Sequence, residues 1–343
     1  DCFFCAYRMS GYTSNSMFQE EEGTSRKARN PRRMLETKKV MEIIDDCAEM
    51  GVSAIQFTGG GEPTIHPDFI PIVAYAQGKG IDTALVTNGN MLHDEEHRKL
   101  VLNMAWVRIS VDAGTVGRYR EDRGVGATAW HRMCEAVKQL SDDREERRNA
   151  NPEWQGPVIG IGFVVNPQNY LEIYQAVGMY SEWGVDNVRL GLMFNPDDMT
   201  PFNEIRGEIA TQSNSAVRDF HVDGKFAVIN RTAEKMEDLE NQNPEYEFCG
   251  FQNFTTYIGG DLNVYRCCVY AYHQHGLVGS LKDIGLKEFW ESQAKKDDFD
   301  GFKATSCERC QFNDINRAIN AGMDNPSLIP LEGAEAPFHG NFV

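Results

Sequence analysis

The sequence predicts an α/β protein with a parallel sheet in its first two-thirds and a smaller α+β domain after it. Short apolar runs that end in glycine or polar residues alternate with helical segments up to about residue 195, and then the alternation stops. Alternating units of this length are typical of a parallel sheet with right-handed crossovers. Of the 343 residues, 41% are hydrophobic, and no long apolar run occurs. The composition therefore predicts a globular protein without a transmembrane helix.

Five strands are expected in the first domain, and a helix is expected after each of the first four. The strands are predicted at residues 53–59, 82–89, 106–114, 157–166 and 186–194. The helices are predicted near residues 68–79, 94–103, 126–140 and 169–183. The carboxyl ends of parallel strands form the active site in such folds. The chemistry is therefore expected at "TGGGEP", "TNG", "SVDAG" and "VVN", which follow the first four strands.

Two stretches interrupt this pattern and mark the domain organisation. Residues 141–156 are charged and contain Pro and Gly, which predicts a solvated loop beyond the preceding helix. Residues 201–245 are polar and acidic and are interpreted as helical connectors, after which hairpin-like runs begin. We therefore predict domains at residues 1–235 and 246–325, with a C-terminal tail at residues 326–343.

The charge of the chain is strongly acidic, with one basic exception. The net charge is -17, which argues against broad non-specific binding of nucleic acid. Residues 24–39, "TSRKARNPRRMLETKK", carry seven Lys or Arg and one Glu. They are either a solvated loop or a dock for a phosphate-bearing or acidic substrate, such as a nucleotide, nucleic acid or peptide. No secretory signal is visible, and we predict a cytoplasmic protein with no membrane contact.

Seven of the nine cysteines form two groups, one at each end of the chain, which suggests two metal sites. Cys47 and Cys134 lie in helical patterns and are predicted to be buried core thiols. Cys2 and Cys5 form a CxxC pair at the start of the chain. Such a pair alone fits a zinc knuckle, a redox pair or part of an iron–sulfur ligand set. The rest of the sequence must therefore decide between them.

The stretch "FTGGGEP" at residues 57–63 is the most informative motif. Its three glycines follow a strand and let a ligand approach the backbone closely. It is not a phosphate-binding loop, because the lysine and hydroxyl of the GxxxxGK[ST] motif are missing. Glu62 supplies a carboxylate suited to an ammonium group, and a tight turn between strand and helix is the alternative interpretation.

The CxxC pair and the GGGEP turn together resemble the radical S-adenosylmethionine (SAM) superfamily. In that family a CxxxCxxC loop after the first strand binds a [4Fe–4S] cluster, whose open iron takes SAM. The resemblance implies that Cys2 and Cys5 are two of these ligands. It also implies that the first cysteine and the first strand would precede Asp1, so the given sequence is expected to be part of a longer protein. The implied fold is a partial (β/α)6 barrel of the TIM type.

The resemblance further implies a set of residues that contact SAM. The turn formed by residues 59–62 matches the one that holds the SAM ammonium group, and residues 110 and 112 match a polar pair near the ribose. Arg123 resembles the arginine that pairs with the SAM carboxylate. Turn-forming or packing roles are the alternative for Phe4, Asn88 and Asn166. The full expected set is Phe4, Gly59, Gly60, Gly61, Glu62, Asn88, Ser110, Asp112, Arg123 and Asn166.

The C-terminal runs "IGGDLNVYRCC" and "GSLKDIGLKEFWES" resemble the twitch domain, the short form of the SPASM extension of radical SAM dehydrogenases. The resemblance implies an auxiliary [4Fe–4S] cluster with four thiolate ligands, and zinc is the alternative. Leu262 stands where the family has glycine, and Cys268 competes with Cys267 for one ligand position. The expected ligands are Cys249, Cys267, Cys307 and Cys310.

The implied chemistry starts with one electron passing from the reduced cluster to SAM. The C5′–S bond then breaks to give methionine and a 5′-deoxyadenosyl radical, which takes a hydrogen atom from the substrate. The auxiliary cluster would assist oxidation or rearrangement of the substrate, and a flavodoxin or ferredoxin would supply electrons. A nucleotide or nucleic-acid isomerase, a peptide maturase and a non-catalytic iron–sulfur protein with a degenerate site stay open. No residue identifies itself as the general base, so catalytic side chains are unassigned.

Overall fold

The computed structural model describes residues 2–5, 34–194, 200–240, 243–308 and 310–325. The chain divides into two compact units, residues 1–5 with 55–236 and residues 6–54 with 237–343. The break after Met236 lies one residue beyond the predicted end of the first domain. The second unit, however, also includes a stretch from the start of the chain, which the sequence analysis had assigned to the first domain.

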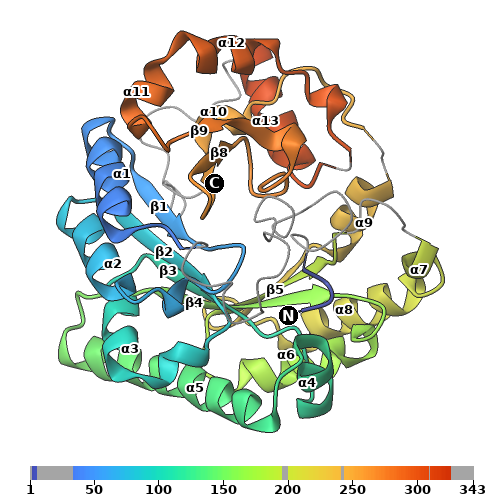
Figure 1. Cartoon of the computed structure of the whole chain (residues 1–343). Helices are drawn as coiled ribbons and strands as arrows, with labels where there is room; N and C mark the ends of the chain where they lie inside the picture. The colour runs from blue at the N-terminus through green and yellow to red at the C-terminus, as the bar shows by residue number, and fades with distance from the viewer. Residues whose placement is uncertain (1, 6–33, 195–199, 241–242, 309, 326–343) are drawn as a thin grey trace, which may run out of the picture. The chain divides into compact units, whose positions relative to one another are not determined.

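A six-stranded sheet forms the first unit, and its strands lie in the order of the sequence (Figure 1). The strands are β1 Ala54–Phe57, β2 Asp82–Thr87, β3 Trp106–Ser110, β4 Val158–Val165, β5 Asn187–Leu192 and β6 Ala227–Asn230. Every pairing from β2 to β6 is parallel. Parallel neighbours require a crossover between them, and helices supply it. This architecture confirms the predicted α/β class with a parallel sheet.

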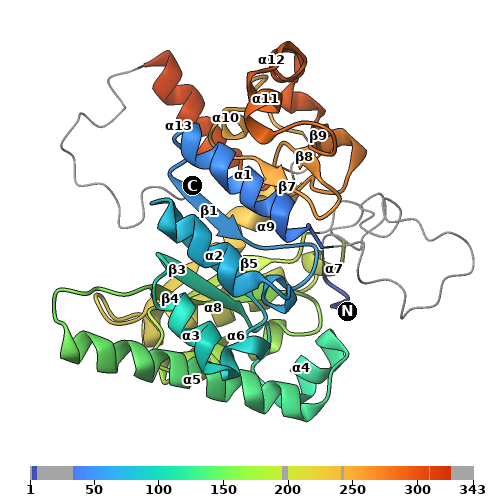
Figure 2. The same ribbon diagram turned by 60° about the vertical axis from the view of Figure 1, so that its left-hand side comes forward.

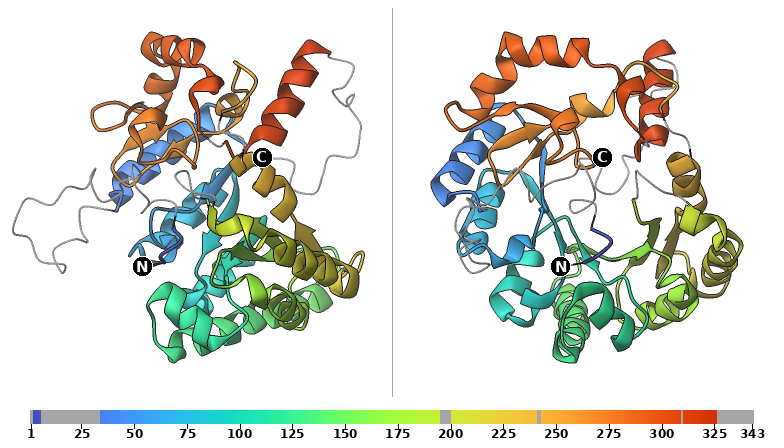
Figure 3. Two further views of the ribbon diagram at one scale, coloured as in Figure 1. Left: turned by 90° about the vertical axis from the view of Figure 1, so that its right-hand side faces the viewer. Right: turned by 45° about the vertical axis from the view of Figure 1, so that its right-hand side comes forward.

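The helices of the first unit lie on the outer side of the curved sheet (Figure 3). They are α2 Phe69–Gly78, α3 Glu95–Val101, α4 Val116–Arg123, α5 Ala127–Ala150, α6 Ile173–Ser181, α7 Thr200–Asn203, α8 Arg206–Phe220 and α9 Thr232–Glu240, the last crossing into the second unit. Short 3-10 helices occur at Pro63–Ile65, Asn90–His93 and Tyr170–Glu172. Ile109, Ile161 and Val188 of the central strands are fully buried, as are Ala176 and Val177 of α6. Strand residues buried in this way explain the continuous apolar runs in the sequence.

Two predicted connections were wrong. The stretch predicted to be a loop from residue 141 is helical as far as Ala150, where α5 ends. No Gly or Pro interrupts it, and Arg144 anchors it from a position that is only 2% exposed. Arg144 donates to the Asp186 carboxylate and to the carbonyl oxygens of Pro157 and Gly184, the last at 2.9 Å. Buried ion pairing therefore holds a segment that its charge had suggested was solvated.

The second wrong connection is residues 201–245, which hold a strand as well as the predicted helices. Strand β6 pairs with β5, with Ala227 opposite Asn187, and completes the sheet. It is only four residues long, with Phe226 before it and Arg231 after it. Its strand character therefore depends on the neighbour with which it pairs, because so short a run carries little periodicity of its own.

The second unit contains helix α1 Thr37–Glu49 and an antiparallel sheet of β7 Tyr257–Ile258, β8 Asn263–Tyr265 and β9 Leu277–Ser280. Its other helices are α10 Phe251–Phe254, α11 Leu286–Glu291, α12 Gln293–Gly301 and α13 Asn313–Asp324, with 3-10 turns at Gln274–Gly276 and Ala304–Ser306. Helix α1 packs beside α11 (Figure 2). The Lys287 backbone N–H donates to the Asp46 carboxylate at 3.1 Å, and Lys39 donates to the Ile284 carbonyl at 3.0 Å. These contacts explain why α1 belongs to the second unit.

The two helical cysteines differ in burial. Cys47 is buried in α1, as predicted, and burial raises its pKa to about 11. Cys134 of α5 is half-buried, and burial raises its pKa to about 12. Both thiols are therefore protonated at neutral pH, which suits packing rather than chemistry. In the part of the chain that the structure describes, no helix is both long and apolar enough to cross a membrane.

Candidate functional site

Glu62 joins the turn after β1 to the end of β2. Its Oε1 accepts hydrogen bonds from the Thr64 backbone N–H at 3.2 Å and from the Thr64 and Thr87 hydroxyls at 2.5 and 2.7 Å. Its Oε2 accepts one from the Asn88 backbone N–H at 2.7 Å. An ionised carboxylate has about four acceptor positions, two on each oxygen. Oε1 accepts three hydrogen bonds and Oε2 only one, so Oε2 is the oxygen with room for a further donor. The carboxylate therefore holds the turn in place, besides the ammonium contact that the sequence predicts for it.

The glycines of the same turn leave open space beside the backbone. Gly60 and Gly61 are exposed, and Gly59 is half-exposed. A Cβ added at Gly61 would meet no atom within 4 Å, whereas one at Gly59 would lie 3.4 Å from the Gly61 nitrogen. The exposed side of the turn is therefore accessible to a ligand at backbone distance, as the glycine run predicts.

Asn88 uses its side chain within its own turn. Its Oδ1 accepts from the Asn90 backbone N–H at 2.8 Å and from the Asn90 side-chain amide at 3.2 Å. The next residue, Gly89, has φ +78°, and a Cβ there would lie 2.9 Å from Ile109 Cγ2. Only glycine fits this position without displacing the β3 side chain. The geometry at Asn88 matches the turn-forming alternative that the sequence left open.

Arg123 and Asp112 form a buried ion pair at the end of β3. Arg123 Nη2 lies 2.5 Å from Asp112 Oδ2 and donates to the Ser110 carbonyl at 2.8 Å. Asp112 Oδ1 accepts from the Val164 backbone N–H at 2.7 Å. Burial raises the pKa of Asp112, and the Arg123 guanidinium opposes that rise. Both oxygens of Asp112 are thus engaged within the protein, which leaves the Ser110 side chain as the freer member of the predicted polar pair.

The CxxC pair lies at the same edge of the sheet as this ion pair. Arg123 Nη1 is 3.7 Å from the Cys2 sulfur. The Cys5 backbone N–H donates to the Cys2 carbonyl at 3.4 Å, so the pair forms a tight turn, and both thiols are half-buried. Phe4 packs edge-on against Phe3, with ring centroids 5.4 Å apart. Arg123 thus places a positive charge beside one sulfur of the CxxC pair.

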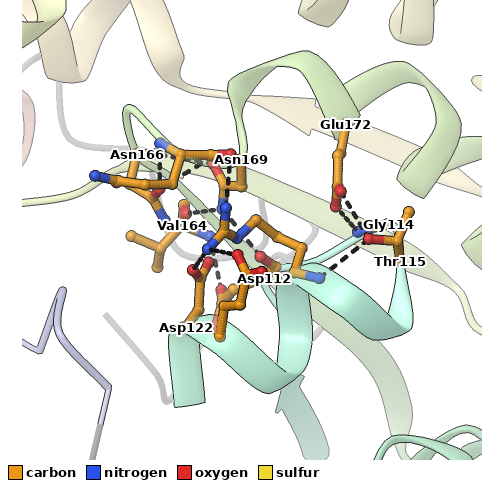
Figure 4. Close-up of polar contacts among 11 residues, drawn as sticks. Asp112, Gly114, Thr115, Asp122, Val164, Asn166, Asn169 and Glu172 are labelled. Atoms are coloured by element: carbon orange, nitrogen blue, oxygen red, sulfur yellow. Dashed lines mark hydrogen bonds and ion pairs between the residues drawn. The ribbon is translucent and has the colours of Figure 1, made fainter. Parts of the chain in front are cut away.

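Asn166 lies fully buried at the end of β4, where it shapes the loop that follows (Figure 4). Its Oδ1 accepts from the Gln168 and Asn169 backbone N–H groups at 2.9 and 3.2 Å. Asn169 in turn donates to the Asp112 and Val164 carbonyls, both at 2.9 Å. Asn169 therefore ties the ends of β3 and β4 together, a role that sequence reasoning missed because nothing distinguishes it from Asn166 in "VVNPQN".

A second layer of polar contacts supports these strand ends (Figure 4). Arg118 Nη2 lies 2.7 Å from Asp122 Oδ1. Burial raises the pKa of Asp122, while Arg118 and the Asn166 side chain lower it. Glu172 accepts from the Gly114 N–H and the Thr115 hydroxyl, both at 2.7 Å. The sequence analysis did not single out Glu172, because its partners lie 57 and 58 residues away along the chain.

In the second unit, four cysteines line one cavity: Cys249, Cys267, Cys307 and Cys310. They come from three loops: Cys249 precedes α10, Cys267 follows β8, and Cys307 and Cys310 share the loop between the 3-10 turn at Ala304–Ser306 and α13. Cys267 lies on the cavity wall, whereas Cys268 is exposed and is not among the lining residues. Among the described residues, no three His, Cys, Asp or Glu side chains are arranged to hold a metal ion as they stand. The observed feature is therefore a shared thiol-lined cavity.

Burial raises the pKa of all four thiols, in the case of Cys307 to about 12. Neighbouring sulfurs raise it further at Cys307, where Cys310 and Cys249 contribute. Unliganded thiols here are consequently protonated and must lose their protons when they bind a metal. The donor set fits a thiolate-ligated iron–sulfur cluster by its chemistry.

Polar groups surround the sulfurs in this cavity. The Phe312 backbone N–H donates to the Cys310 sulfur at 3.4 Å, and the Tyr246 hydroxyl lies 3.8 Å from it. His275 Nε2 lies 3.6 Å from the Cys307 sulfur, and burial lowers the pKa of His275. Hydrogen bonds to ligand sulfurs are one way in which proteins tune iron–sulfur clusters.

The parallel partial barrel, with polar side chains gathered at its strand ends, defines a protein of the radical SAM fold class. In agreement with it, residues 1–144 match the family model of the Radical SAM superfamily. This first part of the chain is therefore similar to the Radical SAM superfamily. The expected class is thereby confirmed for this part of the chain.

Curated proteins and solved structures are similar to parts of this chain. The Fe-coproporphyrin III synthase of Methanosarcina barkeri is 30% identical over 142 residues, 40% of this chain and 31% of that protein. The probable GTP 3',8-cyclase of Saccharolobus solfataricus is 26% identical over 192 residues, 55% of this chain and 52% of that protein. The chain thus spans about half or less of these relatives. The crystal structure of Streptococcus suis SuiB bound to its precursor peptide SuiA matches in fold, with a TM-score of 0.54, 16% identity, and coverage of 88% of this chain and 63% of that one.

Proposed function

We propose that the protein is a radical SAM enzyme. Cys2 and Cys5 would supply two thiolates to a [4Fe–4S] cluster, and the strand ends that carry Glu62 and Ser110 would bind SAM. One observation carries the proposal. Arg123, fixed by Asp112 at the end of β3, lies 3.7 Å from the Cys2 sulfur, so the CxxC pair and the strand-end residues share one edge of the sheet.

A [4Fe–4S] cluster held by these cysteines would supply the electron for reductive cleavage of SAM. The residues of this chain position and shield that chemistry. Arg123 balances the negative charge of the thiolate ligands, and Asp112 keeps the guanidinium in place. Glu62 holds the glycine turn against β2 and offers Oε2 to the SAM ammonium, a charge-assisted hydrogen bond of the stronger class. Precise placement of the reacting C–H bond is what the protein contributes to such reactions.

The thiol-lined cavity of the second unit would hold an auxiliary [4Fe–4S] cluster of the twitch type. Four cysteines share this cavity, and protein groups approach two of the sulfurs. A cluster with four thiolate ligands has no open iron, so its role would be to exchange electrons with the substrate radical. The net reaction would then be an oxidation or a rearrangement of the substrate, supported by an electron donor such as flavodoxin or ferredoxin.

Two substrate classes have support from the comparisons. A nucleotide substrate is supported by the relative whose name is GTP 3',8-cyclase. A peptide substrate is supported by the fold likeness to SuiB, which was solved with its precursor peptide. Of the basic segment 24–39, which suggested an acidic or phosphate-bearing substrate, residues 24–33 lie outside the described residues.

The decisive experiment for the radical SAM activity is reductive cleavage of SAM. Anaerobically reconstituted protein is mixed with SAM and dithionite, and 5′-deoxyadenosine is measured by chromatography. We expect 5′-deoxyadenosine from the parent and none from Cys5→Ala. Cys134→Ala is the control and should also form 5′-deoxyadenosine, because the thiol that it removes is not part of the CxxC pair. A parent that holds iron and yet forms no 5′-deoxyadenosine would be a non-catalytic iron–sulfur protein.

A further inference from the structure

Arg266 is a buried cation in the wall of the thiol-lined cavity. It directly precedes Cys267 and is only 7% exposed. Of the described residues that line the cavity, it alone carries a permanent charge. A buried charge is costly unless it is paired and hydrogen-bonded, so the partners of Arg266 determine how it is kept beside four thiols.

Three contacts hold the Arg266 guanidinium in one orientation. Nη2 lies 2.5 Å from Asp298 Oδ2, and Nη1 donates to Gln252 Oε1 at 2.9 Å. The guanidinium carbon lies 3.9 Å from the centroid of the Phe302 ring, within the range of a cation–π contact. Gln252 is 1% exposed, and Phe302 also lines the cavity. The cation is therefore fixed against the cavity rather than free to reach solvent.

Arg266 lines the same cavity as the four sulfurs that are proposed as ligands. Cys267 follows it directly in the chain, and Cys249, Cys307 and Cys310 complete the set on the cavity wall. Asp298 binds the guanidinium with a side chain that is 33% exposed. The positive charge thus acts in a water-poor space, while its counter-charge is partly screened by solvent.

We propose that Arg266 sets the reduction potential of the auxiliary cluster, an inference that rests on the function proposed for this cavity. A cubane on four thiolates is anionic, and its reduction adds one more negative charge. A fixed cation stabilises the reduced form more than the oxidised form, so Arg266 raises the potential. Asp298 opposes this effect in part, and Gln252 and Phe302 keep the guanidinium in position.

The test compares reduction potentials by redox titration monitored with electron paramagnetic resonance. The full chain is used with Cys2→Ala and Cys5→Ala, so that the signal comes from the auxiliary cluster alone. Arg266→Gln should shift the potential to more negative values. We expect at least a tenfold fall in the ratio of reduced to oxidised cluster at a fixed potential, which is about 59 mV for a one-electron couple.

Two further variants separate charge from structure. Arg266→Lys keeps the positive charge and should retain most of the parent potential. Asp298→Asn removes the opposing carboxylate and should shift the potential to more positive values. If Arg266→Gln fails to take up iron, the sign of the Asp298→Asn shift decides the question. A shift of that variant to more negative values, or none, would overturn the proposal.

The outcomes also distinguish this inference from the proposed function. A parent that carries zinc or no metal in this cavity would remove the auxiliary cluster and the role of Arg266 together. A parent and an Arg266→Gln variant with full iron content and equal potentials would leave the auxiliary cluster in place and reject the role of Arg266.

Discussion

At the residue scale, Glu62 combines a structural role with a proposed ligand contact. Four donors from Thr64, Thr87 and Asn88 face its carboxylate. Its Oε1 also caps the 3-10 turn at Pro63–Ile65 through the Thr64 N–H. The loss of this side chain would leave several donors without their acceptor and would loosen the glycine turn.

We predict that Glu62→Ala weakens SAM binding and leaves the iron content intact. It should also lower the free energy of unfolding by about 1–3 kcal/mol, because the Thr87 hydroxyl and the Asn88 N–H lose a charged acceptor. Equilibrium dialysis with SAM, iron analysis and urea unfolding measure the three quantities. Glu62→Gln keeps one acceptor oxygen and should lie between parent and Glu62→Ala. Unchanged SAM affinity in Glu62→Ala would remove Glu62 from the binding site.

Leu262 occupies a backbone conformation that favours glycine. Its φ is +63°, in the left-handed region. Its N–H donates to the Gly259 carbonyl at 3.0 Å, while the Gly259 N–H donates to the Asn263 carbonyl at 2.9 Å. A turn closed in this way between two strands places one residue in the left-handed region. This geometry explains why a glycine is expected at the position where this chain has leucine.

We predict that Leu262→Gly stabilises the protein by about 1 kcal/mol, because the left-handed conformation costs a residue with a Cβ about 1–2 kcal/mol. Urea unfolding of the metal-free protein measures the change. Leu262→Ala is the matched control, since it removes the side-chain atoms beyond the Cβ. Because the Cβ remains, this variant should not be more stable than the parent. Equal stabilities of the Gly and Ala variants would show that side-chain packing, rather than backbone strain, governs this position.

At the scale of elements, α5 depends on one buried arginine. Arg144 donates to the carbonyl oxygens of Pro157 and Gly184 and pairs with Asp186, which itself accepts from the Ile159 N–H at 2.7 Å. These partners lie at the start of β4 and just before β5. The C-terminal half of the helix is therefore joined to two strand ends by a single side chain.

We predict that Arg144→Ala lowers the free energy of unfolding by about 3–5 kcal/mol, because it leaves buried acceptors and a carboxylate without their partner. Arg147→Ala, one turn further along the same helix at an exposed position, is the control and should cost about 1 kcal/mol or less. Denaturant unfolding compares the two variants. A loss in Arg144→Ala no larger than in the control would mean that α5 is held by its apolar face alone.

At the scale of the whole molecule, the six cysteines proposed as metal ligands fall into two groups that belong to different units. Cys2 and Cys5 are part of the first unit, and the four cysteines of the cavity are part of the second. Each group has its own cation nearby, Arg123 in one case and Arg266 in the other. Two independent metal centres are the simplest expectation from this arrangement.

We predict that anaerobically reconstituted full-length protein holds about eight irons per chain, as two cubanes on thiolates. Cys307→Ala should lower the iron content to about four and leave reductive cleavage of SAM in place. Cys268→Ala, which changes the exposed neighbour of Cys267, is the control and should keep about eight. Metal analysis that finds about four irons together with zinc in the parent would reject the auxiliary cluster.

The basic segment gives a prediction about the substrate. We expect phosphate-bearing ligands to bind through Arg29, Arg32 and Arg33, because Arg recognises phosphate oxygens bidentately. Binding of short oligonucleotides should fall steeply with salt, as counterions are released, and should weaken when the three residues are changed to Ala. Fluorescence anisotropy at low and moderate salt measures this. Equal, salt-insensitive binding by both proteins, or none, would favour a small-molecule or peptide substrate.

The sequence by itself determined the class of fold and the edge of the sheet at which polar residues gather. The apolar runs alternate with helices, and the glycine and polar residues that end them include Glu62, Asn88 and Asp112. Both signals are local, because strand and helix periodicity is repeated within a few residues. In a parallel sheet the strand ends that such motifs follow must meet at one edge.

Only the tertiary structure decided which partners these residues take and to which unit each segment belongs. Asp186 forms an ion pair with Arg144, which lies 42 residues away in the sequence. The Asp46 carboxylate accepts a hydrogen bond from the Lys287 backbone N–H, 241 residues away in the sequence. The placement of Arg266 against the thiol-lined cavity likewise depends on Asp298, Gln252 and Phe302, which lie on other elements. Such contacts have no local signature, because their energy arises from desolvation and pairing that exist only once distant segments are packed together.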